Sequence, residues 1–502
     1  MVTASVLELG NDEVYYFQYA MDLQPNYFDH PPGVACLIRI FTLNLVLTDE
    51  FFIRLGAIVC AAIGTVLSYE LGKRIKNERT GWFAAILYTS SIYSSVIAGT
   101  FIIPDSPQIV FWLASLLVMH HILFAKEEQS VLTRSWLAFG TLTGLAILCK
   151  VHGIFLWVSM GLYILLFKPV LLKDRRLYLS AILTVVLISP ILLWNIQNDF
   201  ITYRFHSDRV AIRDSGIHLG YFFQTLVGQL LYNNPVNSVL IILTLWKLKT
   251  LDFLDRNAVW FLLLNGIPII VIVCAMSLFN PMLPHWSGPG FLVLSFLTAS
   301  YLDDKTPKSI DEPRILKASV GVVAALLLLA VAAIRFYPGT IGSKDMRSFG
   351  EGDFTLDLYG WKQFSKEFGP WLKEQEDKGK LSPDLSFVSN NWYPAAHIDY
   401  YVAIPLHRPL IGVSHVVYLH HYYWLNRQRP PLQIGDSALW ILPSNYPMVL
   451  EKTFYWHFNS IEMLRIFYSY RGGKVARYFT VYLLKDYKMN DQAHQPPRKS
   501  NN

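Results

Sequence analysis

Long apolar runs separated by short polar loops dominate the first two thirds of the chain. Ten of these runs approach the ~20 residues that a helix needs to cross a bilayer. We therefore expect ten membrane helices, at residues 51–72, 81–98, 106–124, 136–149, 154–167, 177–196, 219–246, 258–279, 286–302 and 318–336. The stretch 33–47 is either an eleventh span or a helix lying in the membrane interface.

The pattern changes after residue 336. Residues 337–502 carry 34 charged side chains, which is near the density of a soluble protein. Helical periodicity at 361–374 is followed by short β-branched or aromatic runs at 385–388, 438–442 and 478–484. The pattern predicts a membrane domain over 1–336, with a first loop at 1–50, a small α/β domain over 337–485 and a disordered tail over 486–502.

Composition supports a membrane protein. Of the 502 residues, 53% are hydrophobic and only 16% are charged, whereas a soluble chain carries about 25% charged residues. The same numbers exclude an ordinary soluble enzyme and a disordered chain. The net charge of +6 is too small to indicate a nucleic-acid partner.

The distribution of charge predicts the orientation. One set of alternate loops holds seventeen Lys and Arg residues and the opposite set holds four. Because positive loops stay in the cytoplasm, the chain is expected to lie in the plasma (inner) membrane with its first loop and its C-terminal domain outside the cytoplasm. The first ten residues contain no signal peptide, so we expect either a preceding helix or downstream helices to carry the first loop across.

Acidic residues concentrate in the part of the first loop over 1–32, which has no Lys or Arg. Its five carboxylates are Glu8, Asp12, Glu13, Asp22 and Asp29. Asp12 is either a catalytic carboxylate or the N-cap of a helix, and Asp29 is either a site residue or a cap of the turn before the double proline.

A second acid and a few cations are expected on the same side. Asp105 lies in a loop between two spans, where it acts either as a general base or as an N-cap. Snorkelling towards water is the ordinary explanation for a cation at a membrane boundary. The alternative is a phosphate site built from side chains that share this face, namely Lys150, Arg204, Arg209 and His285.

Several chemistries have no motif in the chain. There is no HExxH, P-loop or dinucleotide-binding glycine motif, and the four cysteines show no paired spacing. The sequence therefore supports neither a disulfide framework nor a metal site, and we expect no obligatory cofactor.

The order of motifs resembles a known family. The motifs are Asp-Glu-Val-Tyr-Tyr at 12–16, Tyr-Phe-Asp-His-Pro-Pro at 27–32, Pro-Asp-Ser-Pro at 104–107, Leu-Trp-Asn at 193–195, Arg-Phe at 204–205 and Pro-His-Trp at 284–286. Together they resemble the bacterial dolichyl-phosphate-mannose-protein mannosyltransferase-like enzymes, which are GT-C glycosyltransferases of family 39 and relatives of the lipid A aminoarabinose transferase. The resemblance covers residues 11–302.

The resemblance implies a polytopic helical GT-C fold and a transferase activity. The donor would be a sugar on a polyprenyl phosphate, and the acceptor would be a lipid, polysaccharide or protein outside the cytoplasm. Asp12 would be the general base and Asp105 the second catalytic acid. Donor-phosphate or substrate contacts would come from Glu13, Tyr15, Asp29, His30, Lys150, Arg204, Arg209 and His285.

One of these positions departs from the family. His30 stands where the aminoarabinose transferase has a lysine, and an imidazole is the weaker phosphate ligand at neutral pH. We therefore expect Lys150, Arg204 or Arg209 to bind the donor phosphate. A different class of function, a non-catalytic flippase or transporter of lipid-linked sugars, would place ionisable residues near mid-span. Arg39, Arg54 and Glu70 all lie towards helix ends, which disfavours it.

Overall fold

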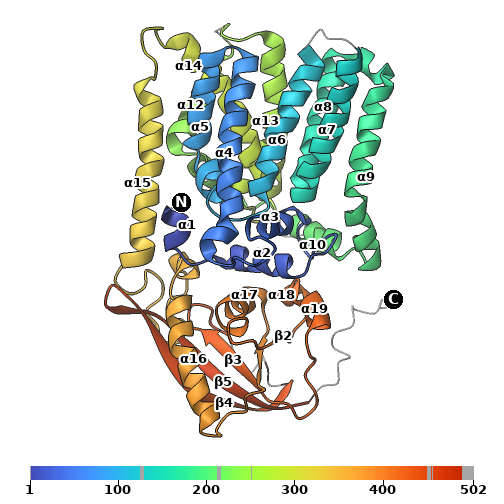
Figure 1. The fold of residues 1–502 in the computed structure, drawn as a ribbon. Helices are drawn as coiled ribbons and strands as arrows, with labels where there is room; N and C mark the ends of the chain where they lie inside the picture. The colour runs from blue at the N-terminus through green and yellow to red at the C-terminus, as the bar shows by residue number, and fades with distance from the viewer. Residues whose placement is uncertain are drawn as a thin grey trace. The chain divides into compact units, whose positions relative to one another are not determined.

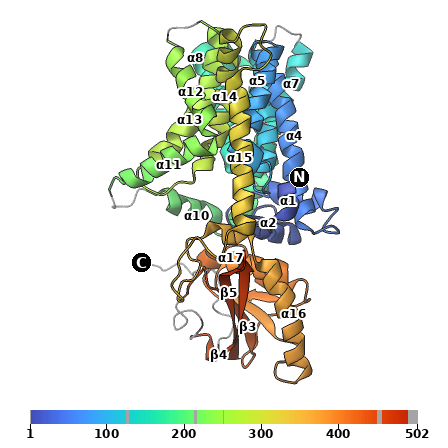
Figure 2. The same ribbon diagram turned by 90° about the vertical axis from the view of Figure 1, so that its left-hand side faces the viewer.

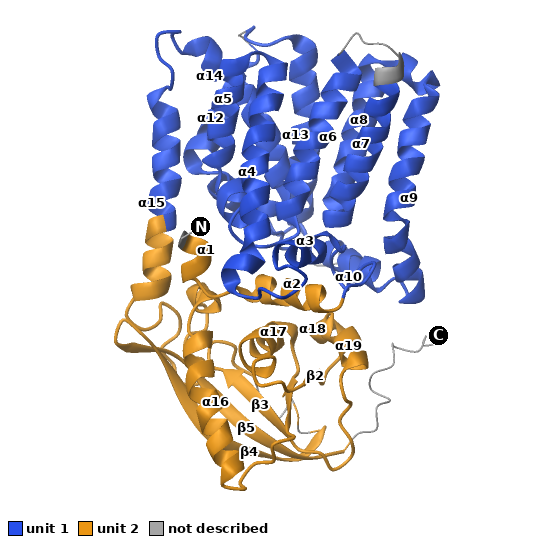
Figure 3. Cartoon of the chain, viewed as in Figure 1, with its two compact units in different colours: residues 1, 23–327 blue, residues 2–22, 328–502 orange. Residues whose placement is uncertain are grey.

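The computed structural model describes residues 2–124, 129–211, 216–249, 252–448, 454 and 456–488. The described chain forms two compact units (Figure 3). The first unit holds residues 23–327, and the second unit holds residues 2–22 together with the chain from Leu328 onward. The first twenty-two residues, part of the predicted first loop, thus fold with the C-terminal part of the chain. Most of the predicted tail, residues 489–502, lies outside the described residues.

The first unit is a bundle of helices (Figure 1). Each of the ten predicted spans overlaps a helix, although the predicted span 81–98 is interrupted after Thr89. The helices are α3 (Gly33–Phe41), α4 (Glu50–Ile75), α5 (Glu78–Thr89), α6 (Asp105–Phe124), α7 (Gln129–Cys149), α8 (Ile154–Phe167), α9 (Arg175–Gln197), α10 (Ile201–Val210), α11 (Leu219–Tyr232), α12 (Pro235–Lys247), α13 (Arg256–Ser277), α14 (Gly288–Lys305) and the greater part of α15 (Arg314–Phe336). Short turns of other helix types are η1 (Tyr93–Ile97, π), η2 (Val151–Gly153), η3 (Pro169–Lys173) and η4 (Pro284–Ser287).

Six helices of the described chain are long and apolar enough to cross a membrane, or seven if one bent pair counts as a span. The predicted eleventh span is excluded, because the nine residues of α3 extend only about 14 Å, against ~30 Å of hydrocarbon. The prediction of one continuous span over 219–246 is also wrong, since α11 and α12 meet at 103°.

The break between α11 and α12 has a local cause. Asn234 adopts a left-handed φ of 70°, and its side chain caps Val236 N at 3.0 Å. Pro235 then starts α12 at a position where its missing N–H costs nothing. Asn234 Nδ2 also donates to Ser90 O and Ser319 O, each at 2.9 Å, so the bend is fixed to two other helices.

The second unit contains a five-stranded mixed sheet of order β2-β1-β3-β5-β4. The strands are β1 (Ser386–Ser389), β2 (Leu410–Gly412), β3 (Ala438–Pro443), β4 (Phe458–Arg471) and β5 (Lys474–Tyr487). β1 pairs in parallel with β2 and β3, whereas β5 runs antiparallel to β3 and β4. The predicted α/β fold of this region is confirmed, although β2 and β4 were not predicted.

Helices and turns complete the second unit. They are α1 (Val2–Val6), α2 (Asn11–Met21), the last turns of α15, η5 (Phe354–Leu358), α16 (Trp361–Asp377), α17 (Trp392–Ile398), η6 (Asp399–Ala403, π), α18 (Val416–Leu419), α19 (Tyr422–Leu425) and η7 (Asn426–Gln428). α16 lies along one face of the sheet (Figure 2). Phe364 of α16 stacks on Phe479 of β5 at 4.3 Å and meets Phe467 of β4 edge-on at 5.5 Å.

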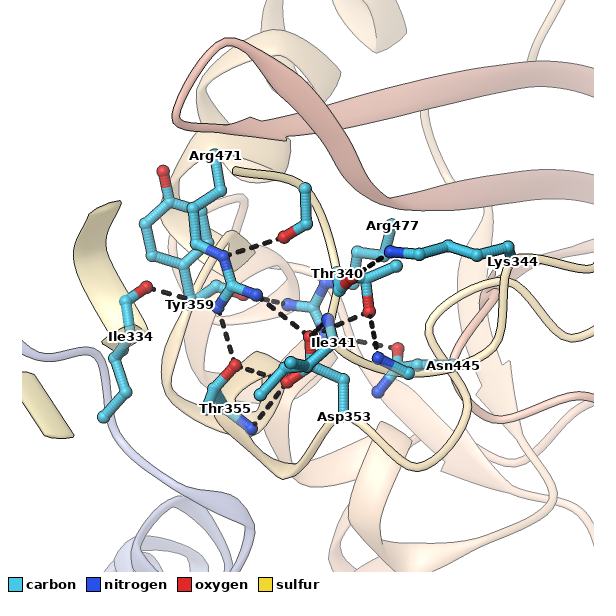
Figure 4. A network of polar contacts seen from close by, with 12 residues as sticks. Ile334, Thr340, Ile341, Lys344, Asp353, Thr355, Tyr359, Asn445, Arg471 and Arg477 are labelled. Atoms are coloured by element: carbon cyan, nitrogen blue, oxygen red, sulfur yellow. Dashed lines mark hydrogen bonds and ion pairs between the residues drawn. The ribbon is translucent and has the colours of Figure 1, made fainter. Parts of the chain in front are cut away.

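A buried polar network fixes the end of α15 to this sheet (Figure 4). The Arg471 guanidinium pairs with Asp353 at 2.9 Å, and both side chains are fully buried. It also donates to Ile334 O and Gly339 O. Thr340 and Thr355 donate to the two oxygens of the Asp353 carboxylate. Because each buried charge is paired and hydrogen-bonded, the network avoids the penalty of an isolated ion.

Candidate functional site

A buried ion pair lies in the first unit at the start of α6. Lys150 Nζ is 2.7 Å from Asp105 Oδ2, and Tyr93 donates its hydroxyl to Asp105 Oδ1 at 2.9 Å. The side chains of Lys150 and Asp105 are 3% and 2% exposed. Lys150 therefore does not snorkel, and Asp105 is more than a helix cap. Such a pair is costly to bury unless its geometry is good and it has further hydrogen bonds, so its presence marks a specialised site.

Local backbone irregularities position the three side chains. Tyr93 opens a π-helical turn, a feature that often occurs at functional sites. Gly288 makes room for it, because a Cβ at that position would lie 2.5 Å from the Tyr93 ring. Lys150 sits in extended conformation at the break between α7 and η2, where Gln108 Nε2 donates to its carbonyl oxygen at 2.7 Å.

Histidines surround the ion pair. The pKa of His285 is lowered to about 4, mainly by burial and then by the charge of Lys150, while Asp105 opposes the shift. The pKa of His30 is likewise lowered to about 4, mainly by burial, against the opposing charges of Asp29 and Asp105. Both imidazoles are therefore neutral at pH 7, and the positive charge of the site comes from Lys and Arg side chains.

These low pKa values predict that acid destabilises the fold. An unfolded histidine binds a proton below about pH 6.5, whereas His30 and His285 in the fold do so only near pH 4. Stability should thus be complete above pH 6.5 and fall as the pH drops towards 4. The check is the thermal unfolding midpoint of the detergent-solubilised protein between pH 7.5 and 5. The double variant His30→Gln/His285→Gln should show a flatter profile. His415→Gln, at an exposed histidine, should match the wild type, and identical profiles for all three proteins would contradict the prediction.

Arg209 supplies an exposed cation to the same cluster. Its guanidinium stacks over Trp286 at 5.3 Å and over Phe205 at 5.7 Å. No ion pair joins it to another residue that the structure describes, and its charge lowers the pKa of His285. His206 lies 2.7 Å from the carbonyl oxygen of Asp29 and so fixes the loop before the double proline. Arg204 is exposed, and no described side-chain contact brings it into this cluster.

Asp12 lies in the second unit, at the second position of α2. The helix begins at Asn11 with Gly10 as its N-cap, so the interpretation of Asp12 as an N-cap is wrong. The adjacent Glu13 has the structural role instead: it is 2% exposed, and its Oε2 accepts a bond from Gly10 N at 2.9 Å. Asp12 is exposed, so solvent reaches its carboxylate.

The rest of the second unit holds α2 along its length. Asn11 Nδ2 donates to Tyr446 OH, and Asn11 Oδ1 accepts from His397 Nε2, both at 2.8 Å. Tyr446 in turn donates to Asp357. Tyr15, which was predicted as a substrate contact, is instead buried: its ring lies 4.7 Å from that of Trp392. Its hydroxyl accepts from His421 N at 3.1 Å.

Glu8 anchors the chain just before α2. Its carboxylate accepts the backbone N–H groups of Trp361 and Lys362 at 2.7 and 3.2 Å, at the N-terminus of α16. Burial raises the pKa of Glu8, while these N–H groups and the Arg477 charge oppose the shift. The exposed carboxylate of Asp12 is thus carried by a helix fixed at both its start and its middle.

The structure groups the predicted residues into two sets. Within the first unit, contacts and charge effects join Asp105, Lys150, His30, Asp29, Arg209 and His285, whereas Asp12, Glu13 and Tyr15 belong to α2 in the second unit. Sequence reasoning missed Tyr93, because a π-turn leaves no readable pattern. Among the described residues no group of three or more His, Cys, Asp or Glu side chains is arranged to hold a metal ion.

Comparisons with known proteins give one family model and two curated relatives. The model for dolichyl-phosphate-mannose-protein mannosyltransferase matches residues 29–194. Lipid A galacturonosyltransferase RgtD of Rhizobium johnstonii is 23% identical over 324 residues, 63% of this chain and 64% of that protein. The undecaprenyl phosphate-alpha-4-amino-4-deoxy-L-arabinose arabinosyl transferase of Pseudomonas aeruginosa is 31% identical over 157 residues, 30% of this chain and 26% of that protein. The matches thus span less than two thirds of either relative.

Solved structures show the same fold. ArnT from Cupriavidus metallidurans, bound to undecaprenyl phosphate, has a TM-score of 0.64 at 15% identity, over 99% of this chain and 96% of that one. The apo form of that protein gives a TM-score of 0.63 over 96% and 95%. The predicted fold class, a polytopic helical membrane protein with a C-terminal α/β domain, is confirmed.

Proposed function

We propose that this chain, which is similar to glycosyltransferases that include an aminoarabinose transferase, transfers a sugar from a polyprenyl-phosphate donor to an acceptor outside the cytoplasm. The observation that carries the proposal is the buried pair of Lys150 with Asp105, a costly arrangement that a purely structural helix bundle does not require. Both residues lie within the stretch 29–194 that the family model matches.

The chemistry follows from the charges of the site. The acceptor hydroxyl oxygen attacks the anomeric carbon of the sugar, the bond from that carbon to the phosphate oxygen breaks, and polyprenyl phosphate leaves with the bonding electrons. Asp12 takes the hydroxyl proton as general base. Lys150 and Arg209 stabilise the negative charge that grows on the departing phosphate. His30 and His285, being neutral, orient the substrate by hydrogen bonds.

Asp105 acts through Lys150 in this scheme. Its carboxylate lies 2.7 Å from the Lys150 ammonium and holds it in place in a buried position. Tyr93 holds the carboxylate in turn. The proposed mechanism needs no metal ion, because the leaving group already carries a phosphate and two cations receive it.

The names of the relatives support a more specific proposal for the chemical class of the donor and of the acceptor. One solved relative is bound to undecaprenyl phosphate, and one curated relative is named as acting on lipid A. We propose a donor of the undecaprenyl-phosphate type and a glycolipid acceptor on the outer face of the inner membrane. Both curated relatives are named as transferases, which favours catalysis over the flippase alternative.

Mass spectrometry of the cell envelope tests the proposed function. Lipids and glycoproteins from cells with and without this protein should differ by one sugar residue on one acceptor, and the mass of that residue identifies the donor sugar. Restoring the wild-type chain should restore the sugar. Identical spectra from both strains, grown where the protein is made, would contradict the proposal.

Asn11→Ala tests whether the hydrogen bonds that hold the start of α2 contribute to catalysis. The change removes the bonds to His397 and Tyr446 beside Asp12, and small misplacements of a catalytic group cost up to about 100-fold in rate. We expect kcat to fall by about 10- to 100-fold while the KM for the donor stays unchanged. Asn459→Ala, at an exposed Asn of β4, should behave as wild type. Equal kcat values for both variants would show that these Asn11 hydrogen bonds have no catalytic role.

A further inference from the structure

A pocket of about 290 Å³ lies in the second unit, and nothing in the proposed mechanism uses it. It is lined by Ile411, Val413, Tyr423, Asn426, Arg427, Arg429, Pro431, Leu432 and Tyr487. Ile411 belongs to β2 and Val413 follows it directly, so the pocket opens at the carboxyl end of a parallel strand. In open α/β sheets this is the edge at which ligands bind.

The floor of the pocket is apolar and aromatic. Ile411, Val413 and Leu432 are each less than 10% exposed, and the two tyrosines, Tyr423 and Tyr487, are 8% and 3% exposed. A lining of aliphatic side chains and two tyrosine rings suits a ligand ring with one apolar face, such as a pyranose sugar. The pocket is too small for an acyl chain together with a headgroup, but it admits one or two sugar rings.

The rim of the pocket is cationic. Arg429 is paired with Asp399 at 2.6 Å and also donates to Leu410 O, so its charge is balanced within the protein. Arg427 is exposed, and its guanidinium stacks over the Tyr423 ring at 5.4 Å. No ion pair joins Arg427 to another described residue. One guanidinium therefore remains to bind an anion, and its planar fork matches a carboxylate or a phosphate.

The pocket is connected to the helix that carries Asp12. Gln428, between the two arginines, donates to Asp22 Oδ1 at the C-terminal end of α2, at 2.6 Å. His421, earlier in the same segment, donates its backbone N–H to Tyr15 of α2. Residues 421–429 thus contact α2 and line the pocket, all within one compact unit.

From these contacts we propose that the pocket is the acceptor subsite and that it binds a saccharide carrying a carboxylate or a phosphate. The sugar ring lies on the tyrosine walls, and Arg427 binds the anionic group. The identification of the bound saccharide as the acceptor rests on the proposed function. The binding of an anionic sugar to the pocket rests on the geometry alone. It gives the C-terminal domain a role in substrate selection.

Binding to the full-length protein in detergent micelles tests the proposal. The probes are glucosamine 1-phosphate and galacturonic acid, with galactose as the neutral control, and saturation-transfer NMR titrations give the affinities. We expect one or both anionic probes to bind at least about 10-fold more tightly than galactose, as a charge-assisted hydrogen bond implies. The anionic probe that binds more tightly shows whether the pocket prefers a phosphate or a carboxylate.

Two variants assign the binding to the pocket. Arg427→Ala should reduce the affinity for the anionic probe by about 10-fold or more and leave the affinity for galactose unchanged. Arg347→Ala, at an exposed Arg of the same unit that does not line the pocket, should bind as wild type. Equal binding of all three probes, or an equal effect of the two variants, would overturn the proposal.

A kinetic arm separates this inference from the proposed function. In transfer assays Arg427→Ala should raise the KM for the acceptor while the KM for the donor stays unchanged. Asp12→Asn should lower the transfer rate by about 10²- to 10⁴-fold yet retain full binding of the anionic probe. If the protein transfers no sugar but binds the anionic probe through Arg427, the proposed function fails and the site remains. If transfer occurs and Arg427→Ala changes neither binding nor acceptor KM, the subsite fails alone.

Discussion

Replacing Asp12 with Asn is expected to lower the rate of sugar transfer by about 10²- to 10⁴-fold, the contribution of a general base. The carboxylate is exposed on the first turn of α2, and the N-cap of that helix is Gly10. Asn cannot accept the hydroxyl proton, so it removes the base. Because Asn keeps the size of the side chain, the fold should be unaffected. Initial rates in proteoliposomes, together with the thermal unfolding midpoint, measure both effects.

The neighbouring Glu13 provides the matched control. Its Oε2 accepts the Gly10 N–H in a buried position, and the amide oxygen of Gln can accept the same bond. Glu13→Gln should therefore retain most of the transfer rate. A full rate in Asp12→Asn would remove Asp12 from the mechanism, and a large loss in Glu13→Gln alone would move the base to Glu13.

Replacing Lys150 with Met is expected to abolish transfer and to destabilise the first unit. The change leaves the Asp105 carboxylate buried without its partner, and breaking a buried pair in this way costs about 3–5 kcal/mol. It also removes the cation that receives the donor phosphate. The expected results are a lower unfolding midpoint and a loss of binding of undecaprenyl phosphate, measured by retention on detergent-solubilised protein.

A double variant separates stability from function at this pair. Lys150→Met with Asp105→Asn removes both charges, so the unfolding midpoint should recover by comparison with the single variant. Binding of undecaprenyl phosphate should stay absent. Recovery of lipid binding along with the fold would show that Lys150 serves stability and that the phosphate is bound elsewhere.

The helical architecture could be predicted from the sequence because apolar run length reports directly on burial in a membrane. The bend between α11 and α12 was missed because the apolar run continues on both sides of it. The Asn-Asn-Pro sequence at 233–235 carried the signal: Pro235 begins a helix, and Asn234 takes a left-handed φ before it. β4 was missed because its polar and apolar residues do not form a short uniform run.

The candidate site could be predicted only in part. Asp105 and Lys150 each stand out as ionisable residues at helix boundaries, but their pairing depends on packing between α6 and the α7–η2 break. Tyr93 looks like an ordinary core tyrosine in the sequence, and only the π-turn and the space above Gly288 direct it to Asp105. The resemblance implied substrate contacts for Glu13 and Tyr15, whereas their side chains are buried in the packing of α2.

The grouping of the first residues with the C-terminal domain was also hidden from sequence reasoning. Position in the chain suggested that residues 1–50 belong to the membrane domain. The bonds from Glu8 to α16, from Asn11 to Tyr446 and from Gln428 to Asp22 join residues more than 350 positions apart. No local pattern in a single sequence encodes contacts of that separation.

The most direct test of the proposed function follows both products of one reaction. Purified protein is reconstituted in vesicles with a radiolabelled sugar on undecaprenyl phosphate and with an extract of envelope glycolipids as acceptor. We predict that label moves from the donor to one acceptor while an equal amount of undecaprenyl phosphate is released, and that Asp12→Asn does neither. Label that stays on the donor in the wild type, or that moves equally well with Asp12→Asn, would contradict the assignment of this chain as a transferase that uses Asp12 as its base.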